Sequence, residues 1–347
     1  MGISDKLKAF DPNGVGNTSN NIFGLPFDVD ESRLVFIPAP WDVTTSGQAG
    51  AADGPVNIFH HSFQIDLFDP LLPDAWKQGM AMEKVDPFIV RKNREIRKLA
   101  RNIIDHLEAG NSIHGNDPKQ SELSRVNKAC EEYMALMENK CLQYLHNGQA
   151  PFIVGGEHSV SIGLIRALAS RHDHFGILQI DAHADMRKAY QGFTHSHASV
   201  MRLAAETKGV SKIVQVGIRE LCGEELQFIS RHNQVIKTFY GHDMHRRLFE
   251  REPWSGICRD IVEMLPDKVY VTFDVDGLDP AWCPGTGTPV PGGITFSQAV
   301  YLMEAVFRAG KHVIGADLVE TGPGKIDGIV SSRLLYRMAG MVIQGNQ

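Results

Sequence analysis

The stretch Phe175-Gly-Ile-Leu-Gln-Ile-Asp-Ala-His-Ala-Asp185 decides the fold and indicates where a functional site lies. Its first six residues are mostly apolar and have the length of a buried parallel strand. Because side chains alternate in an extended chain, Asp181, His183 and Asp185 point to one side. Unpaired charge at the end of a buried strand is costly, so we expect a bound cation there. The plainer interpretation is an N-cap in a solvated turn.

A second apolar strand, Lys268–Asp274, also ends in carboxylates. Asp274 and Asp276 are two residues apart, so alternation directs both to the same side. If the two strands share a sheet, four carboxylates meet, and such a cluster repels itself without cations. A third strand from residue 152 runs into a Gly-Gly turn with His158 just beyond it. This set of oxygens and two imidazoles, without a thiolate, suits two divalent ions and favours Mn²⁺ over Zn²⁺.

Several motifs, taken together and in this order, resemble the ureohydrolase family, which contains arginases and agmatinases. They are Gly155-Gly-Glu-His158, Asp181-Ala-His-Ala-Asp185, Ser196-His-Ala198, Thr272-Phe-Asp-Val-Asp-Gly-Leu-Asp-Pro280 and Pro284-Gly-Thr-Gly-Thr-Pro289. The resemblance runs from about residue 34 to the C-terminus, and its last motif looks more like agmatinases than arginases. It implies a manganese enzyme that hydrolyses a guanidino compound, with agmatine, converted to putrescine and urea, as the leading substrate.

The resemblance also implies how the metal ligands divide between two ions in each subunit. One ion would be held by His158, Asp181, Asp185 and Asp274, and the other by Asp181, His183, Asp274 and Asp276. Asp181 and Asp274 would therefore bridge the ions. Two ions roughly 3.5–4 Å apart can share a water and lower its pKa, which provides a nucleophile for the unreactive guanidinium carbon.

Two further residues are candidates for catalysis. The leaving amine must be protonated, and His197 in the Ser-His-Ala motif is the candidate for this transfer, with His195 as its competitor. Glu320 follows an apolar strand and would bind the guanidinium NH groups through two parallel hydrogen bonds. Asp317, three residues earlier, could instead cap or orient. The plainer interpretations are an exposed loop histidine and a strand-end salt bridge.

Arg187 bears on the substrate, because it lies close to where arginases read the amino-acid head. Arginine keeps its charge, so an Arg187 that points into the site mouth would favour a carboxylate-bearing tail over an ammonium. Agmatine remains compatible, and arginine, 4-guanidinobutyrate, free guanidine and formiminoglutamate stay open. A two-metal phosphoesterase and a catalytically inactive metal-binding scaffold are the alternatives from other classes. Trp282 and the Pro-Gly run after it are expected to form one pocket wall.

Composition excludes several classes of protein. The chain has 347 residues, 43% hydrophobic, which is enough for one large α/β domain. A net charge of -6 gives no indication of a nucleic-acid partner. No apolar run approaches the roughly 20 residues that span a bilayer, and no signal peptide is evident. The five scattered cysteines are typical of reduced thiols in a cytoplasm.

The order of patterns along the chain predicts the domain organisation. Residues 1–32 read as a loose N-terminal arm and residues 33–347 as one α/β domain. Helical periodicity over 89–147 predicts an inserted helical hairpin, whose loop contains a solvated His114. A long Gly/Ala/Thr loop follows the first strand, from Thr44 to Pro55.

From residue 159 onward, predicted strands and helices alternate. Strands are expected at 34–37, 175–180, 212–217, 234–239, 268–274 and 312–318, and helices at 159–171, 197–208, 221–231, 254–265, 297–309 and 327–342. Such alternation predicts a three-layer αβα fold around a parallel sheet, arginase/deacetylase-like, with the metal site at the carboxyl ends of the strands. The family's usual trimers or hexamers imply a homo-oligomer that acts on a small guanidino molecule.

Overall fold

The computed structural model describes residues 3–113 and 118–346, so His114 lies outside the described residues. Within them, eight strands form one parallel sheet in the order β2-β1-β3-β8-β7-β4-β5-β6. The strands are β1 (Leu34–Ala39), β2 (Met80–Met82), β3 (Ala150–Gly155), β4 (Phe175–Ile180), β5 (Val210–Ile218), β6 (Ile236–Tyr240), β7 (Lys268–Asp274) and β8 (His312–Val319).

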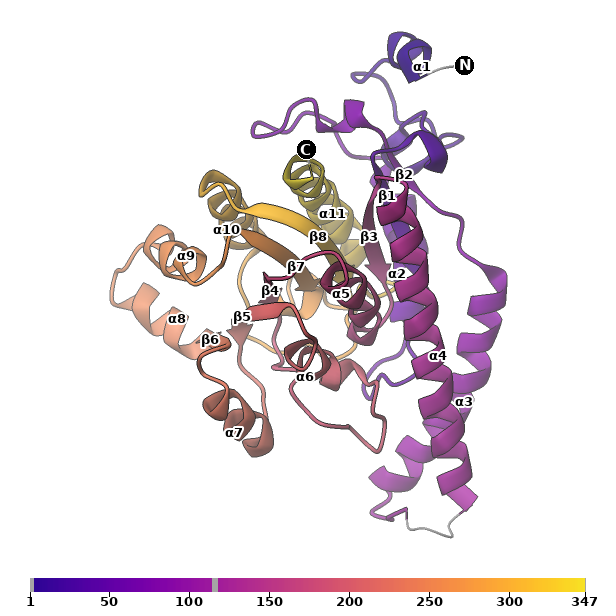
Figure 1. Cartoon of the computed structure of the whole chain (residues 1–347), viewed down its shortest axis with the longest axis vertical. Helices are drawn as coiled ribbons and strands as arrows, with labels where there is room; N and C mark the ends of the chain where they lie inside the picture. Colours follow the sequence, from indigo (N-terminus) through magenta and orange to yellow (C-terminus); the bar gives the residue numbers. More distant parts are fainter. Residues whose placement is uncertain (1–2, 114–117, 347) are drawn as a thin grey trace.

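Helices cover both faces of the sheet, which confirms the predicted three-layer αβα fold (Figure 1). One face packs on α2 (Gly54–Ser62), α8 (Gly241–Phe249), α9 (Trp254–Glu263), α10 (Phe296–Arg308) and α11 (Lys325–Gly345). The other packs on α5 (Ser161–Ala169), α6 (Val200–Ala205) and α7 (Gly223–Arg231), with α3 (Pro87–Glu108) and α4 (Pro118–His146) beyond them. Because both faces are covered, the central strands β3 and β4 are buried along their whole length.

Within the α/β domain, β2, α2 and α8 were not predicted from the sequence. β2 is only three residues long and lies at a sheet edge, so it is too short to show a pattern. α2 begins at Gly54-Pro55, inside the segment predicted as a long loop. Proline fits the first turn of a helix, where its missing N–H is not needed, so Gly-Pro here starts a helix. α8 is a short helix of nine residues with only two buried residues, Gly241 and Met244, so few apolar residues indicate it in the sequence.

The N-terminal segment is more ordered than a loose arm. α1 spans Ile3–Ala9, and Lys6 forms an ion pair with Glu31. Further along, Ile22 and Phe27 are buried in the hydrophobic core on the face covered by α2 and α11. The apolar residues within this Asn- and Gly-rich segment therefore pack on the domain.

α3 and α4 lie side by side on the right of Figure 1. Lys92 of α3 pairs with Glu132 of α4 at 3.1 Å, and α4 buries Tyr133 and Met134 toward α5. The helical pair thus forms an outer layer over α5. Among the described residues, no helix combines the length and apolar character that crossing a membrane requires.

Candidate metal centre

The strand register brings the predicted ligands to one edge of the sheet. Ile180 at the end of β4 pairs with Phe273 of β7, so Asp181 and Asp274 come next at adjacent strand ends. β7 pairs with β8, and β8 pairs with β3, whose end leads to His158. Since the carboxyl ends of parallel strands meet at the same edge, residues far apart in sequence converge there.

A first cluster surrounds the imidazole of His158. Its Nδ1 lies 2.9 Å from Asp185 Oδ2, 3.1 Å from Asp181 Oδ2 and 3.4 Å from Asp274 Oδ2. All four side chains are buried. Nδ1 nevertheless satisfies no hydrogen-bond geometry, although it is surrounded by oxygens. A nitrogen without a hydrogen-bond partner that several carboxylate oxygens approach is the donor arrangement of a divalent cation site.

A second cluster lies beside the first. His183 Nδ1 is 3.0 Å from Asp276 Oδ2 and 3.7 Å from Asp181 Oδ1. The two oxygens of Asp181 therefore face different histidines, as a bridging carboxylate would. His158, Asp181 and Asp185 have the spacing of potential metal ligands, and so do Asp181, His183 and Asp276. Asp274 lies beside the first of these sets, next to His158. All six residues that the sequence suggested as metal ligands thus come together.

The electrostatics of the clusters favour a bound cation. Burial, followed by the negative charge of Asp181, raises the pKa of Asp185 to about 7. Burial and the charges of Asp276 and Asp181 raise the pKa of Asp274 well above its usual range. These carboxylates need either protons or cations to share so small a buried volume. Oxygen-rich donors with two imidazoles fit divalent ions such as Mn²⁺.

Buried polar residues orient the ligands from behind. His158 Nε2 donates to Thr272 Oγ1 at 2.8 Å, and that hydroxyl donates to Asp317 Oδ1 at 2.8 Å. This chain places the proton of His158 on Nε2 and leaves Nδ1 to face the carboxylates, as ligation requires. On the other side, Gln179 Nε2 donates to Asp181 Oδ2 at 2.8 Å. Asp317, which the sequence left without a definite role, therefore orients His158 through the hydroxyl of Thr272.

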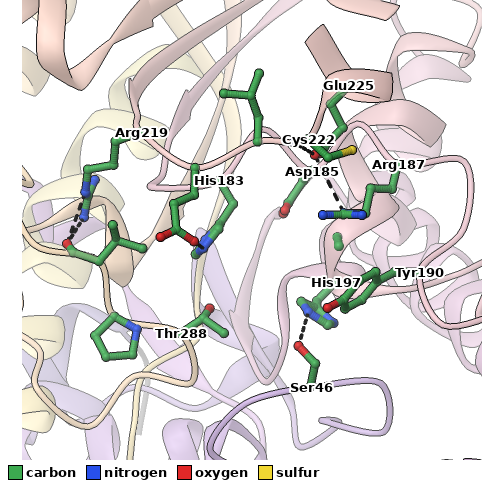
Figure 2. Close-up of a pocket in the computed structure, with 15 residues that line it drawn as sticks. Ser46, His183, Asp185, Arg187, Tyr190, His197, Arg219, Cys222, Glu225 and Thr288 are labelled. Carbon is green, nitrogen blue, oxygen red and sulfur yellow. Dashed lines mark hydrogen bonds and ion pairs between the residues drawn. The ribbon is translucent and has the colours of Figure 1, made fainter. Parts of the chain in front are cut away.

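A cavity of about 630 Å³ opens over the clusters (Figure 2). His183, Asp185, Arg187 and His197 line it, whereas His195 is not among the lining residues. Burial, followed by the positive charges of His183 and Arg97, lowers the pKa of His197 to about 3. His197 is therefore a neutral imidazole at the cavity.

Glu320 lies at the end of β8, between the first cluster and the loop around Gly287. Its Oε1 accepts the N–H of His158 at 2.9 Å, while the buried Oε2 has no hydrogen-bond partner. Its backbone φ is +59°, and that of Asp185 is +52°. Side chains other than glycine rarely adopt this region, and such strain concentrates at functional sites. The unpartnered Oε2 can accept a hydrogen bond from a guanidinium.

Charged residues lie at the mouth of the cavity. Arg187 lies 3.7 Å from Glu225 and stacks over the ring of Tyr190 at 4.7 Å. Its charge is thus balanced by a buried carboxylate. Glu220, by contrast, has 61% of its side chain exposed and lies 3.8 Å from His183 Nε2. The mouth therefore presents an accessible negative charge.

The expected pocket wall is only partly where the sequence placed it. Thr288, Pro289 and Val290 of the Pro-Gly run line the cavity. Trp282 does not, because its ring packs on Phe296 at 6.0 Å, away from the cavity lining. The indole is partly buried against the hydrophobic cluster to which α10 contributes.

Some residues around the site were not found from the sequence. Gln179 and Thr272 are polar residues inside apolar strands, and that mismatch was the available signal. Arg219 has no such signal. Its guanidinium donates to the carbonyls of Asp276, at 2.6 Å, and Val290, at 2.7 Å, so it ties the metal cluster to the cavity wall.

Comparisons with known proteins agree with this site. A model described as the arginase family matches residues 32–342. The N(1)-aminopropylagmatine ureohydrolase of Thermus thermophilus is 32% identical over 316 residues, which cover 90% of this chain and 91% of the relative. The agmatinase of Bacillus subtilis is 36% identical over 298 residues, 85% of each chain. The agmatine ureohydrolase structure from Thermoplasma volcanium has a TM-score of 0.69 at 21% identity, covering 98% of this chain and 97% of that one.

Proposed function

The chain belongs to the arginase family, and from this premise we propose that it hydrolyses agmatine to putrescine and urea with two Mn²⁺ ions. It is a hydrolase of C–N bonds in guanidino compounds, as its named relatives are. The observation that carries the proposal is the pair of buried clusters that share Asp181 beneath a cavity with an acidic mouth.

The charges at the mouth support a substrate with a cationic tail. Arg187 is balanced by Glu225, so it attracts a carboxylate only weakly. Glu220 is the acid available to pair with a terminal ammonium. Arginine and 4-guanidinobutyrate would bring a carboxylate toward Glu220, where like charges repel. Agmatine carries an amine at this end and no carboxylate.

The side chains around the cavity hold the ions, bind the guanidinium and transfer a proton. When bound, the ions supply the Lewis acidity that makes water a nucleophile near neutral pH. Six side chains would hold the ions: His158, Asp181, His183, Asp185, Asp274 and Asp276. Glu320 Oε2 accepts hydrogen bonds from the guanidinium and fixes its carbon over the cluster. His197 accepts a proton from the nucleophile and returns it to the departing amine, so that urea and the amine are released.

A longer substrate is the second candidate. The cavity of about 630 Å³ lies in the range of sites for much larger ligands, roughly 300–1,000 Å³. N(1)-aminopropylagmatine has the same guanidino group and carries an added aminopropyl group at the opposite, amine end, and the named Thermus relative acts on it. A cavity of this volume with an acidic rim accommodates that extension.

Urea release from a panel of substrates tests the proposal. Mn²⁺-loaded protein is supplied separately with agmatine, N(1)-aminopropylagmatine, arginine, 4-guanidinobutyrate and free guanidine. We expect the highest kcat/KM for one of the two amine-tailed compounds. A preference for a carboxylate-bearing compound would overturn the assigned substrate while leaving the chemistry in place, and no urea from any of them would overturn both.

Replacing Glu220 with glutamine is expected to lower kcat/KM for agmatine about tenfold, mainly through KM. A hydrogen bond to a charged group contributes about 1.5–3 kcal/mol, and part of this survives in the neutral amide. Steady-state urea assays with agmatine and with free guanidine measure the effect. Guanidine has no tail, so its kcat/KM should stay unchanged.

The neighbouring exposed Glu224, which does not line the cavity, provides the matched control as Glu224→Gln. An equal loss with agmatine and guanidine in Glu220→Gln would assign Glu220 to the metal site instead of the tail.

We also propose that the native ion is Mn²⁺ and that the protein is a cytoplasmic homo-oligomer, a trimer or hexamer. The oxygen-rich donor set supports the ion. All five cysteines are free, which suits a reducing compartment. Light scattering on the purified protein measures the subunit number, and a monomer would contradict the assembly.

A further inference from the structure

A short segment between β1 and α2 lies against His197. The hydroxyl oxygen of Thr44 accepts the backbone N–H of His197 at 3.1 Å and lies 3.2 Å from its Nδ1. Ser46 Oγ lies 3.5 Å from the other ring nitrogen, Nε2, on the cavity side (Figure 2). The two ring nitrogens of His197 therefore face different hydroxyls of one segment.

The peptide units on both sides of Thr44 are held by charged side chains from elsewhere in the fold. Glu157 Oε2 accepts the N–H of Thr44 at 2.7 Å. Arg97 of α3 donates to the carbonyl of Val43 at 2.9 Å and also to the carbonyl of Thr45. Thr44 is fully buried, so these contacts are shielded from solvent.

A second residue of α3 fixes the start of the same segment. Asn93 accepts the N–H of Asp42 and donates to its Oδ1, both at 2.9 Å. Asp42 Oδ2 in turn accepts the N–H of Gly50 at 3.1 Å. Asn93 and Arg97, which are four residues apart on α3, thus hold the segment at two points. Asn93 is itself buried.

The carboxylate of Glu157 fixes the direction of the hydrogen bonds that the Thr44 hydroxyl makes. Glu157 accepts at both oxygens, from Ser159 Oγ at 2.6 Å and from Thr44 Oγ1 at 3.0 Å. The single hydroxyl proton of Thr44 is thereby donated to the carboxylate, its strongest acceptor. Both lone pairs of Thr44 then accept from His197, one from the backbone N–H and one from Nδ1–H.

We propose that Thr44 is a positioning residue that holds His197 in the tautomer with the proton on Nδ1 and the lone pair of Nε2 facing the cavity. Glu157 orients the hydroxyl, and Asn93 and Arg97 of α3 anchor the segment that carries it. The outer helical pair thereby has a role at the site. The inference rests on the proposed function only for its effect on rate, because the tautomer itself is a property of the protein without substrate.

Nitrogen NMR tests the tautomer without any substrate. Protein with ¹⁵N-labelled histidine is loaded with diamagnetic Zn²⁺ or Mg²⁺, and the His197 signals are assigned by their loss in His197→Asn. We expect Nδ1 protonated and Nε2 bare at neutral pH in the wild type. Protonated Nε2, with Nδ1 accepting from Ser196 Oγ 3.3 Å away, would overturn the proposal whatever the enzyme does.

Thr44→Val keeps the shape and removes the hydroxyl. We expect kcat to fall roughly 10–100-fold, as for other residues that orient a reacting group. KM and the content of two ions per chain should hold, the Nδ1 signal should shift, and Thr44→Ser should restore most of the rate. The matched control is Thr45→Val, which removes a buried hydroxyl 3.4 Å from Glu157 Oε2 that has no contact with His197.

The outcomes separate the inference from the proposed function. An unchanged kcat in a folded Thr44→Val protein, or equal losses in Thr44→Val and Thr45→Val, would overturn the positioning role. If Thr44→Val does not fold, the wild-type tautomer still decides. If the wild type releases no urea from any substrate yet shows the expected tautomer, the proposed function fails and the positioning of His197 stands.

Discussion

Asp181→Asn is expected to lose both bound ions and to reduce urea release at least 10³-fold, on the order of what removing a key catalytic donor costs. Asp181 is fully buried, and its two oxygens face His158 and His183 separately. Asparagine keeps the shape but offers one neutral oxygen in place of two charged ones. Changing a residue that orients a metal ligand lowers metal affinity or activity about 10–100-fold, so changing a bridging ligand should lower them further.

Elemental analysis after gel filtration, together with urea assays on the same sample, measures this effect. The control is Asp173→Asn on the exposed turn before β4, which should retain ions and rate. An active Asp181→Asn protein with its full metal content would contradict the assignment of the whole cluster.

Glu320→Gln is expected to lower kcat/KM for agmatine roughly 10²-fold or more while the ions stay bound. The unpartnered Oε2 is the acceptor assigned to the guanidinium, and Oε1 is already used by the His158 N–H. Removing one member of a buried, hydrogen-bonded charge pair costs about 2–5 kcal/mol. Glutamine can still accept the His158 N–H, so the first cluster should keep its shape.

Urea assays and metal analysis separate this role from a structural one. The exposed Glu263→Gln on α9 provides the control and should behave as the wild type. Loss of metal in Glu320→Gln would mean that the carboxylate supports the ligands, and a rate within threefold of wild type would remove it from substrate binding.

The convergence of the strand-end carboxylates and histidines was predictable from the sequence for a physical reason. Alternation in an extended chain fixes the direction of Asp181 and His183, and parallel strands bring their ends to one edge. The strand order that places β3, β8, β7 and β4 side by side, and the register between these strands, had to be learned from the structure. Those local and topological rules also predicted the three layers.

The surroundings of the ligands were not predictable, because they depend on contacts across many residues. Thr44 reaches His197 from 153 positions away, and Arg97 reaches Val43 from a helix that carries no motif. The ion pair that neutralises Arg187 with Glu225 could not be seen in the sequence for the same reason. The sequence therefore did not decide between substrates with an ammonium tail and those with a carboxylate tail. Buried polar contacts of this kind follow from packing, which no single-sequence pattern encodes.

The most direct test of the central claim is a titration of metal-free protein with Mn²⁺, in which urea release from agmatine is followed at each addition. We expect no urea without metal and a rate that rises and saturates when two ions are bound per chain. Full activity in the presence of a chelator, or saturation with a single ion, would contradict a centre built on both clusters.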